Sequence, residues 1–238
     1  MTKLIYLEDT YLFKAIAKVM EIKNTEFGQA IILDQTVFYP QGGGQPCDQG
    51  KIYSGKGVFI VSKVQLDENG VVYHFGEFES GNFEKDEIVD LEIDSKRRII
   101  NAKNHSAGHL IDCAVSKAGL SNLKPIKGYH FPEGPYIEYE GEVVSPDELV
   151  LKIEKITNDL IQEKLLLKKE KLSFEEARKM GIFAPAGKSA RIVSFEGFSI
   201  CGCGGTHISN SGEIGKIKIR KISSKKGRVR IAYLVDVS

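Results

Sequence analysis

The stretch Asn104-His105-Ser106-Ala107-Gly108-His109-Leu110 decides how this 238-residue sequence is interpreted. It lies in a segment with helical spacing that runs from about Lys96 to Lys117. Two histidines four residues apart on a helix lie one turn apart on the same face. Their imidazole nitrogens can therefore converge on one metal ion, although such a pair also occurs as a packing or surface feature.

A second pair of metal-ligand residues lies far downstream, in Cys203-Gly204-Gly205-Thr206-His207. The two pairs together supply three imidazoles and one thiolate, a set that suits tetrahedral zinc. We therefore predict a zinc site made by His105, His109, Cys203 and His207.

The composition is that of an ordinary soluble protein, with a formal net charge of +1. The length allows one large domain or two small ones. We find no apolar run of membrane-spanning length and no signal-peptide layout, so we expect a cytoplasmic protein with no membrane partner. The four cysteines are then expected to be reduced thiols.

Residues 1–94 are rich in short β-branched or aromatic runs separated by turn residues, which predicts a small barrel or sandwich. Within this half lies the glycine-rich stretch Phe38 to Gly50, with Gly42, Gly43 and Gly44 in a row. It is either a tight turn between strands or a place where the backbone approaches a ligand. It is not a Walker phosphate loop, because no Gly-Lys-Ser/Thr follows.

The pattern becomes helical near Asp94-Ser95, either of which can cap the first turn. Asp112, three residues after His109, is either an acceptor for the second ring N–H of that histidine or a solvated carboxylate. A hairpin is expected over Gly128–Phe131 and Tyr136–Tyr139. A long helix with a capping box at Ser145 is expected to carry its apolar stripe as far as Leu167. Its far end is basic, at Lys164, Lys168, Lys169 and Lys171.

The last part of the chain alternates like strands and is strongly basic. Between Lys216 and Arg230 there are eight lysines and arginines and no carboxylate. A hairpin with its apolar side chains inward would align most of these charges on the outer face, where they either contact nucleic-acid phosphates or only solubilise the surface. The residues assigned to nucleic acid are Lys216, Lys218, Arg220, Lys225, Lys226, Arg228 and Arg230.

Two other zinc chemistries are excluded by spacing. A zincin has Glu directly after the first histidine, where this chain has Ser106. The His-x-Glu and Pro-Cys-x-x-Cys pattern of the zinc deaminases is also missing.

His105-x-x-x-His109, followed far downstream by Cys203-x-x-x-His207, resembles the editing domain of alanyl-tRNA synthetase. The glycine-rich stretch upstream is similar to the one that precedes that domain. With three motifs in the right order over nearly the whole chain, the sequence most resembles the free-standing editing proteins called AlaX, of medium length. The resemblance implies an α+β fold, with a small N-terminal β-barrel (1–94) followed by a two-layer α/β editing domain (95–238). It also implies hydrolysis of the ester that joins serine or glycine to alanine-specific tRNA, so the expected partner is mischarged tRNA(Ala).

In the family, the zinc ligands fall on His105, His109, Cys203 and His207, and Thr206 lies beside the last of them. The resemblance makes Gly42, Gly43, Gly44 and Gln45 substrate-binding candidates. This chain departs from the family at Gln41 and Cys47, where Glu and Gly are expected, and at Ile126, where relatives carry the Thr or Gln that helps to recognise serine. Cys201 is an additional thiol, but only Cys203 has the matching gap to His207.

The general base is not evident from the sequence. Thr206 and His130 are candidates, although for His130 a surface position in the hairpin is the stronger expectation. The leading hypothesis is a zinc-dependent aminoacyl-tRNA deacylase that acts in trans. The alternatives are a non-catalytic RNA-binding module stabilised by zinc and a zinc hydrolase for small esters or amides. Oligomeric state is left open.

Overall fold

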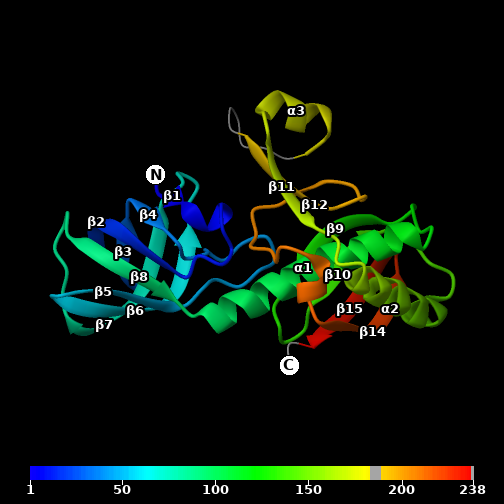
Figure 1. Ribbon diagram of the computed structural model, residues 1–238, viewed down its shortest axis with the longest axis horizontal. Coiled ribbons are helices and arrows are strands. Elements are labelled where there is room, and N and C mark those ends of the chain that lie inside the picture. Colours follow the sequence, from blue (N-terminus) through cyan, green and yellow to red (C-terminus); the bar gives the residue numbers. More distant parts are fainter. Residues whose placement is uncertain (183–188, 237–238) are drawn as a thin grey trace. The chain divides into compact units, whose positions relative to one another are not determined.

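The computed structural model describes residues 1–182 and 189–236, which form two compact units, Met1–Ile99 and Ile100–Ser238 (Figure 1). The fold is mixed α+β, with a closed six-stranded barrel followed by an α/β unit, as the sequence predicted. Among the described residues, none of the helices combines the length and apolar character of a membrane span.

The first unit is a closed antiparallel barrel with strand order β2-β3-β7-β6-β5-β8. Its strands are β2 (Lys14–Thr25), β3 (Gly28–Leu33), β5 (Gly50–Ser54), β6 (Gly57–Leu66), β7 (Val72–Gly81) and β8 (Ile88–Ile93). The short strands β1 (Lys3–Leu4) and β4 (Gln35–Thr36) pair in parallel outside the barrel, and a 3-10 turn, Ile5–Leu7, follows β1.

The barrel closes around alternating apolar side chains. In β6, Phe59 and Val61 point inward, and a bulge between Val61 and Lys63 shifts the alternation so that the next buried side chain is Val64. An extra residue of this kind bends the strand and increases its twist, which helps a small sheet to close.

His74 is a buried histidine of the barrel core with both ring nitrogens bonded. Its Nδ1–H donates to the Ile31 carbonyl at 2.9 Å, and the Thr36 hydroxyl donates to Nε2 at 2.7 Å. Desolvation lowers the pKa of His74 to about 4, so the ring is neutral in the folded barrel.

The long helix α1 (Ser95–Lys117) begins with a cap and a buried arginine. Asp94 Oδ1 accepts a bond from the Arg97 amide at 3.0 Å. Arg98 is fully buried and pairs with the buried carboxylate of Asp48, while it also donates to the carbonyls of Thr10 and Val37. This network fixes the first turn of the helix to the glycine-rich segment and the barrel, because each charge satisfies the other away from water.

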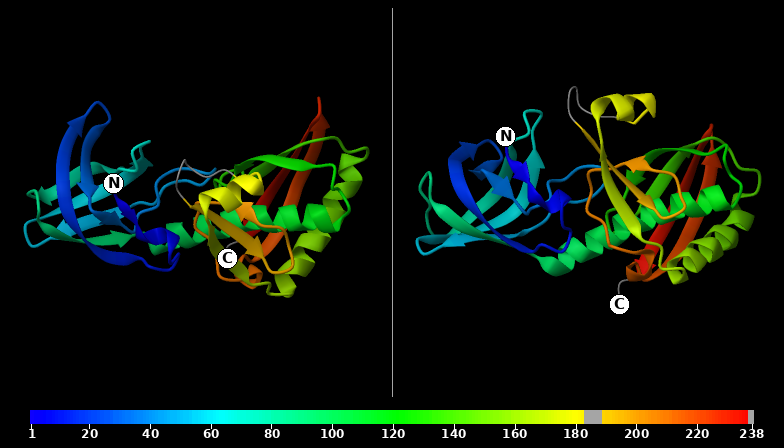
Figure 2. Two further views of the ribbon diagram at one scale, coloured as in Figure 1. Left: turned by 90° about the horizontal axis from the view of Figure 1, so that it is seen from above. Right: turned by 45° about the horizontal axis from the view of Figure 1, so that its top comes forward.

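In the second unit, a four-stranded sheet of order β14-β15-β10-β9 has α1 and α2 on one face (Figures 1 and 2). A smaller sheet, β11-β12-β13, lies on the other side of α1, and β11 and β12 extend as a hairpin that carries α3. The elements are β9 (Lys124–Tyr129), β10 (Tyr136–Glu140), α2 (Pro146–Gln162), β11 (Leu167–Leu172), α3 (Phe174–Lys179), β12 (Ala190–Phe195), β13 (Cys201–Gly202), a 3-10 turn (Ser211–Glu213), β14 (Lys216–Lys225) and β15 (Arg228–Asp236).

Two expectations for α2 are wrong. The helix ends at Gln162, with Lys164 at φ 51°, and Leu167 opens strand β11 instead of completing an apolar helix stripe. The basic residues assigned to its end therefore lie in a turn and a strand. Ser145 precedes the helix but its side chain makes no capping bond, whereas Ser173 forms a complete capping box at α3.

Replacing Arg98 with Met should reduce the free energy of unfolding by about 3–5 kcal/mol, because Asp48 is left buried and charged without its partner. Chemical denaturation followed by circular dichroism measures the loss. Lys56→Met, which removes an exposed pair with Glu84, is the matched control and should leave the midpoint unchanged. Equal midpoints for both variants would show that the buried pair does not hold the helix start.

His74 should make the barrel sensitive to acid. The unfolded chain takes up a proton near pH 6.5 and the folded one only near pH 4, so stability is complete above about pH 6.5 and falls as the pH drops toward 4, by about 3 kcal/mol. Denaturation at pH 7 and pH 4 measures this loss. His74→Gln should have a smaller loss over the same interval, and an identical loss in the variant would contradict the assignment.

Candidate metal centre

Helix α1 presents two histidines side by side. His105 and His109 are one turn apart, and their rings stack with centroids 5.3 Å apart and planes 9° from parallel. Most of the helix from residue 101 to 115 is buried, not one face alone, since it lies between the two sheets of the unit. Small side chains allow this: a Cβ at Gly108 would come within 2.4 Å of the His130 ring.

The loop after β13 brings Cys203 and His207 to the helix. Arg191, on β12, determines its conformation by donating from Nη1 to the carbonyls of Cys203 at 2.7 Å and Gly205 at 2.9 Å. The Gly205 amide in turn donates to the Cys203 sulfur at 3.4 Å. The loop therefore turns around one guanidinium, which holds the cysteine sulfur toward the helix.

The four residues converge as the sequence spacing predicted they would. One ligand atom from each of His105, His109, Cys203 and His207 lies within 4.8 Å of the others. The Cys203 sulfur is 3.3 Å from Nε2 of His105 and 3.3 Å from Nε2 of His207. Nε2 of His109 is buried and has no hydrogen-bond partner among the described residues. A metal ion at this point would accept the lone pair of that nitrogen. The cluster could hold a metal ion.

A serine on α1 contacts His207, the last of the candidate ligands. His207 Nδ1 lies 3.3 Å from Ser106 Oγ, and the Ile208 amide donates to the same oxygen at 3.2 Å. When His207 Nδ1–H donates to that hydroxyl, Nε2 keeps its lone pair toward the cluster. This is the outer arrangement that fixes the tautomer of a metal-bound histidine.

Burial sets the protonation of the donors. Desolvation, with smaller contributions from neighbouring histidines and Arg191, holds the pKa values of His105 and His207 well below the ordinary value, and desolvation lowers that of His109 to about 4. All three rings are thus neutral near pH 7, with lone pairs available for a metal. Desolvation raises the pKa of the Cys203 thiol, while the Gly205 amide and Arg191 oppose the rise.

His130 is not on the surface, contrary to the expectation from its hairpin. It is buried against α1, stacked on His105 with centroids 4.4 Å apart. Gly108 and Gly128 make room for the ring, since a Cβ at either would lie within 2.5 Å of it. Tyr233 donates its hydroxyl hydrogen to the Asn104 carbonyl at 2.9 Å, so Nδ1–H of His130 donates to the Tyr233 oxygen at 2.8 Å and Nε2 carries the lone pair.

A small cavity adjoins the cluster. Its volume is about 90 Å³, and it is lined by His109, Asp112, Cys113, Ser116, Leu167, Val193, Ser194, Phe195, Phe198, Ser199 and Cys201. Asp112 is partly buried, and its Oδ1 accepts a hydrogen bond from the Tyr139 hydroxyl. Desolvation raises the pKa of Asp112 to about 7, although the Tyr139 bond lowers it.

The other predicted site residues lie as follows. Thr206 is fully buried in the loop, and Cys201 is exposed on β13. Ile126 is half exposed on β9 and is not among the residues that line the cavity. In the first unit, Gly42 and Gln45 exchange backbone hydrogen bonds at 2.9 and 3.2 Å, with Gly43 and Gly44 at positive φ, so this segment is a tight turn.

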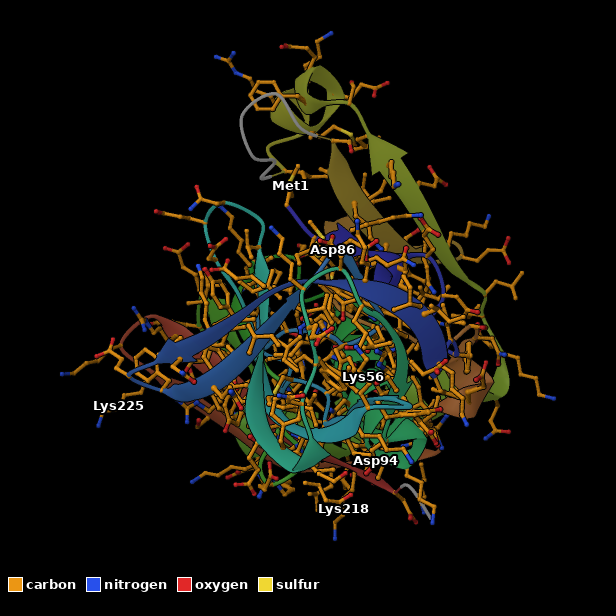
Figure 3. All side chains as sticks on the ribbon, turned by 90° about the vertical axis from the view of Figure 1, so that its left-hand side faces the viewer. Met1, Lys56, Asp86, Asp94, Lys218 and Lys225 are labelled. Atoms are coloured by element: carbon orange, nitrogen blue, oxygen red, sulfur yellow. The ribbon has the colours of Figure 1, made fainter. Side chains whose placement is uncertain are left out.

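The predicted nucleic-acid residues lie on β14, β15 and the turn between them. Lys216, Lys218 and Arg220 are exposed on β14, and Arg228 and Arg230 on β15. Lys225 and Lys226 are exposed at the hairpin turn. Lys218 and Lys225 point into solvent (Figure 3).

Sequence reasoning missed three residues of the site: Arg191, Ser106 in its contact with His207, and Tyr233. Each acts through partners that are about 12 to more than 100 residues away, at 2.7–3.3 Å. Their residue types carry no signal of such a contact in a single sequence. Only the fixed spacing from a histidine could have drawn attention to Ser106.

Comparison with known proteins finds similarity to aminoacyl-tRNA synthetases. Residues 6–97 match the family described as tRNA synthetases class II (A), and residues 190–232 match the threonyl and alanyl tRNA synthetase second additional domain. The alanine–tRNA ligase of Leptospira borgpetersenii is 34% identical over 90% of this chain and 23% of the ligase. That of Methanococcus aeolicus is 32% identical over 100% of this chain and 26% of the ligase.

The chain thus spans about a quarter of the length of the relatives it matches. The two family matches, together with these relatives, confirm the resemblance to alanyl-tRNA synthetase and fit an AlaX-like editing protein.

Arg191→Met should weaken metal binding by about 10- to 100-fold, because the Cys203 loop loses both carbonyl contacts to the guanidinium. Titration of the metal-free protein with Co²⁺, followed by the thiolate-to-metal absorption band, measures the affinity. Arg178→Met, at an exposed position of α3, is the control and should bind as tightly as the wild type. An unchanged affinity for Arg191→Met would contradict this role.

Proposed function

We propose, from the kinship of this chain with the alanyl-tRNA synthetases, that it hydrolyses the ester between a wrong amino acid and tRNA(Ala) at a zinc site. The proposed ligands are His105, His109, Cys203 and His207. The observation that carries the proposal is their convergence beside a small cavity that one of them, His109, also lines.

The spacing of these donors fits a tetrahedral metal site of the size that zinc makes. Zn–N bonds of about 2.0 Å and Zn–S bonds of about 2.3 Å in a tetrahedron separate a nitrogen from a sulfur by about 3.5 Å. The Cys203 sulfur is 3.3 Å from two imidazole nitrogens. Zinc at this position would acidify a water or polarise the ester carbonyl.

The cavity supports a small amino acid as the group removed. About 90 Å³ holds a few waters or a short side chain, and larger side chains would have to displace its walls. Ser116, Ser194, Ser199 and Asp112 are among the residues that line it, so polar side chains are at hand for a serine hydroxyl. We therefore propose serine first and glycine second.

His130 is proposed to orient the attacking water, not to remove its proton. Desolvation lowers the pKa of His130 to about 3, which makes it a poor proton acceptor. Its unprotonated Nε2 still accepts a hydrogen bond, and the Tyr233 contact keeps that nitrogen unprotonated. Thr206 is the other catalytic candidate, because it is adjacent to His207 in the sequence.

The proposed partner is mischarged tRNA(Ala). The exposed lysines and arginines of β14 and β15 are proposed to contact its phosphates, as electrostatic attraction requires. Gly42, Gly43, Gly44, Gln45 and Ile126 stay predicted substrate-binding residues, supported by the resemblance alone. With a soluble tRNA as substrate, we propose a cytoplasmic location.

The test is a deacylation panel on the purified chain, with Ser-, Gly- and Ala-tRNA(Ala) as substrates. Ser-tRNA(Ala) should lose its amino acid fastest and Ala-tRNA(Ala) slowest. Removal of the metal by a chelator should abolish turnover, and one equivalent of Zn²⁺ should restore it.

His109→Ala separates catalysis from a structural role. Loss of turnover with a retained melting temperature is the expected result. Unfolding of this variant, together with no turnover by the zinc-loaded wild type, would instead indicate the non-catalytic zinc module. Ser116→Ala, which removes a cavity hydroxyl but no ligand, is the control for metal content and should lower only the preference for serine.

A further inference from the structure

A carboxyl group lines the cavity beside the candidate metal ligands without a cationic partner. Asp112 lies on α1 three residues after His109, and both residues line the cavity of about 90 Å³. Asp112 Oδ1 accepts a hydrogen bond from the Tyr139 hydroxyl. Oδ2 makes no hydrogen bond with the described residues and is not one of their sealed polar atoms, so it is open to the cavity.

The rest of the cavity wall is either apolar or neutral and polar. Among the described residues that line it, Asp112 is the only one with a carboxyl group, and none is a lysine or an arginine. Leu167, Val193, Phe195 and Phe198 supply apolar surface. A negative charge on this wall is therefore concentrated at a single side chain.

This carboxyl is costly to ionise in the empty cavity. Desolvation raises the pKa of Asp112 to about 7, and the Tyr139 hydrogen bond opposes only part of that rise. A cationic group at Oδ2 would stabilise the charged carboxylate and would form a charge-assisted hydrogen bond with it. The cavity thus suits a ligand that brings its own positive charge to this point.

The place of Asp112 on the helix matches the shape of an α-aminoacyl ester. Residues three apart lie on the same face of a helix, about 4.5 Å apart along its axis. In such an ester the amino nitrogen is two bonds from the carbonyl carbon. An ester carbonyl at the His109 end of the cavity and an ammonium group at Asp112 Oδ2 therefore fit within about one turn of α1.

We propose that Asp112 binds the α-ammonium group of the aminoacyl ester, so that the site selects esters whose amino group is free. In naming an aminoacyl ester, this inference rests on the proposed function. An ester with an acylated amino group carries no positive charge there and leaves the buried carboxylate without a partner. Peptidyl-tRNA, whose amino group is part of a peptide bond, would be spared.

Two small amides test the recognition without any hydrolysis. L-Serinamide carries the ammonium group, whereas 2,3-dihydroxypropanamide has the same shape with a hydroxyl in its place. Isothermal titration calorimetry of the protein at pH 7 should show about tenfold tighter binding of serinamide, as expected for a hydrogen bond between charged groups. Equal affinities for the two amides would overturn the inference.

Asp112→Asn supplies the second test, because it removes the charge but keeps an oxygen that can accept the Tyr139 hydrogen bond. This variant should melt at an unchanged temperature and bind the two amides equally. Asp159→Asn makes the same substitution at an exposed carboxylate of α2, paired with Lys155, and should keep the tenfold preference. A preference retained in Asp112→Asn would contradict the role of its carboxylate.

Deacylation assays separate this inference from the proposed function. The substrates are Ser-tRNA(Ala) and the same tRNA esterified with 2,3-dihydroxypropanoic acid, with each rate divided by that of spontaneous hydrolysis. If the zinc-loaded protein hydrolyses neither, but binds serinamide with a preference that Asp112→Asn abolishes, the ammonium site stands and the proposed function fails. If it hydrolyses both equally well and binds both amides equally, the proposed function stands and the ammonium site fails.

Discussion

Four electron-pair donors gathered at one point, two of them on buried residues and two on partly buried ones, constrain the second unit of this chain. His105, His109, Cys203 and His207 place their ligand atoms within 4.8 Å of one another, and one imidazole nitrogen has no hydrogen-bond partner among the described residues. A polar atom that is removed from water without a hydrogen-bond partner destabilises the folded chain. A metal ion bound by all four ligand atoms would offset that loss. Helix α1 and the Arg191-bound loop bring these donors together.

The two pairs of candidate metal ligands could be picked out from the sequence because the spacing within each pair is a local property of the chain. Two histidines four apart on a helix must share a face, and Cys203 and His207 repeat that spacing in a short loop. The short runs of residues 1–94 predict a small barrel or a sandwich, and the resemblance selects the barrel that the structure has. The glycine-rich segment is compatible with a turn or a ligand loop, and in the structure Gly42 and Gln45 close a tight turn.

What failed depends on tertiary context. The apolar and basic spacing around Leu167 suits a helix, but pairing with β12 makes it a strand after a turn at Lys164. His130 looks like a hairpin surface residue until Gly108 and Gly128 are seen to admit its ring beneath the sheet. The buried charge pair of Arg98 and Asp48 joins residues fifty apart, and neither residue type signals burial in a single sequence.

Anomalous diffraction at the zinc absorption edge, from crystals of protein purified without added metal, tests the central claim most directly. The account predicts one peak per chain, within bonding distance of His105 Nε2, His109 Nε2, His207 Nε2 and the Cys203 sulfur. No peak at these four atoms after loading with Zn²⁺, or a metal bound through Cys201 instead of Cys203, would contradict it.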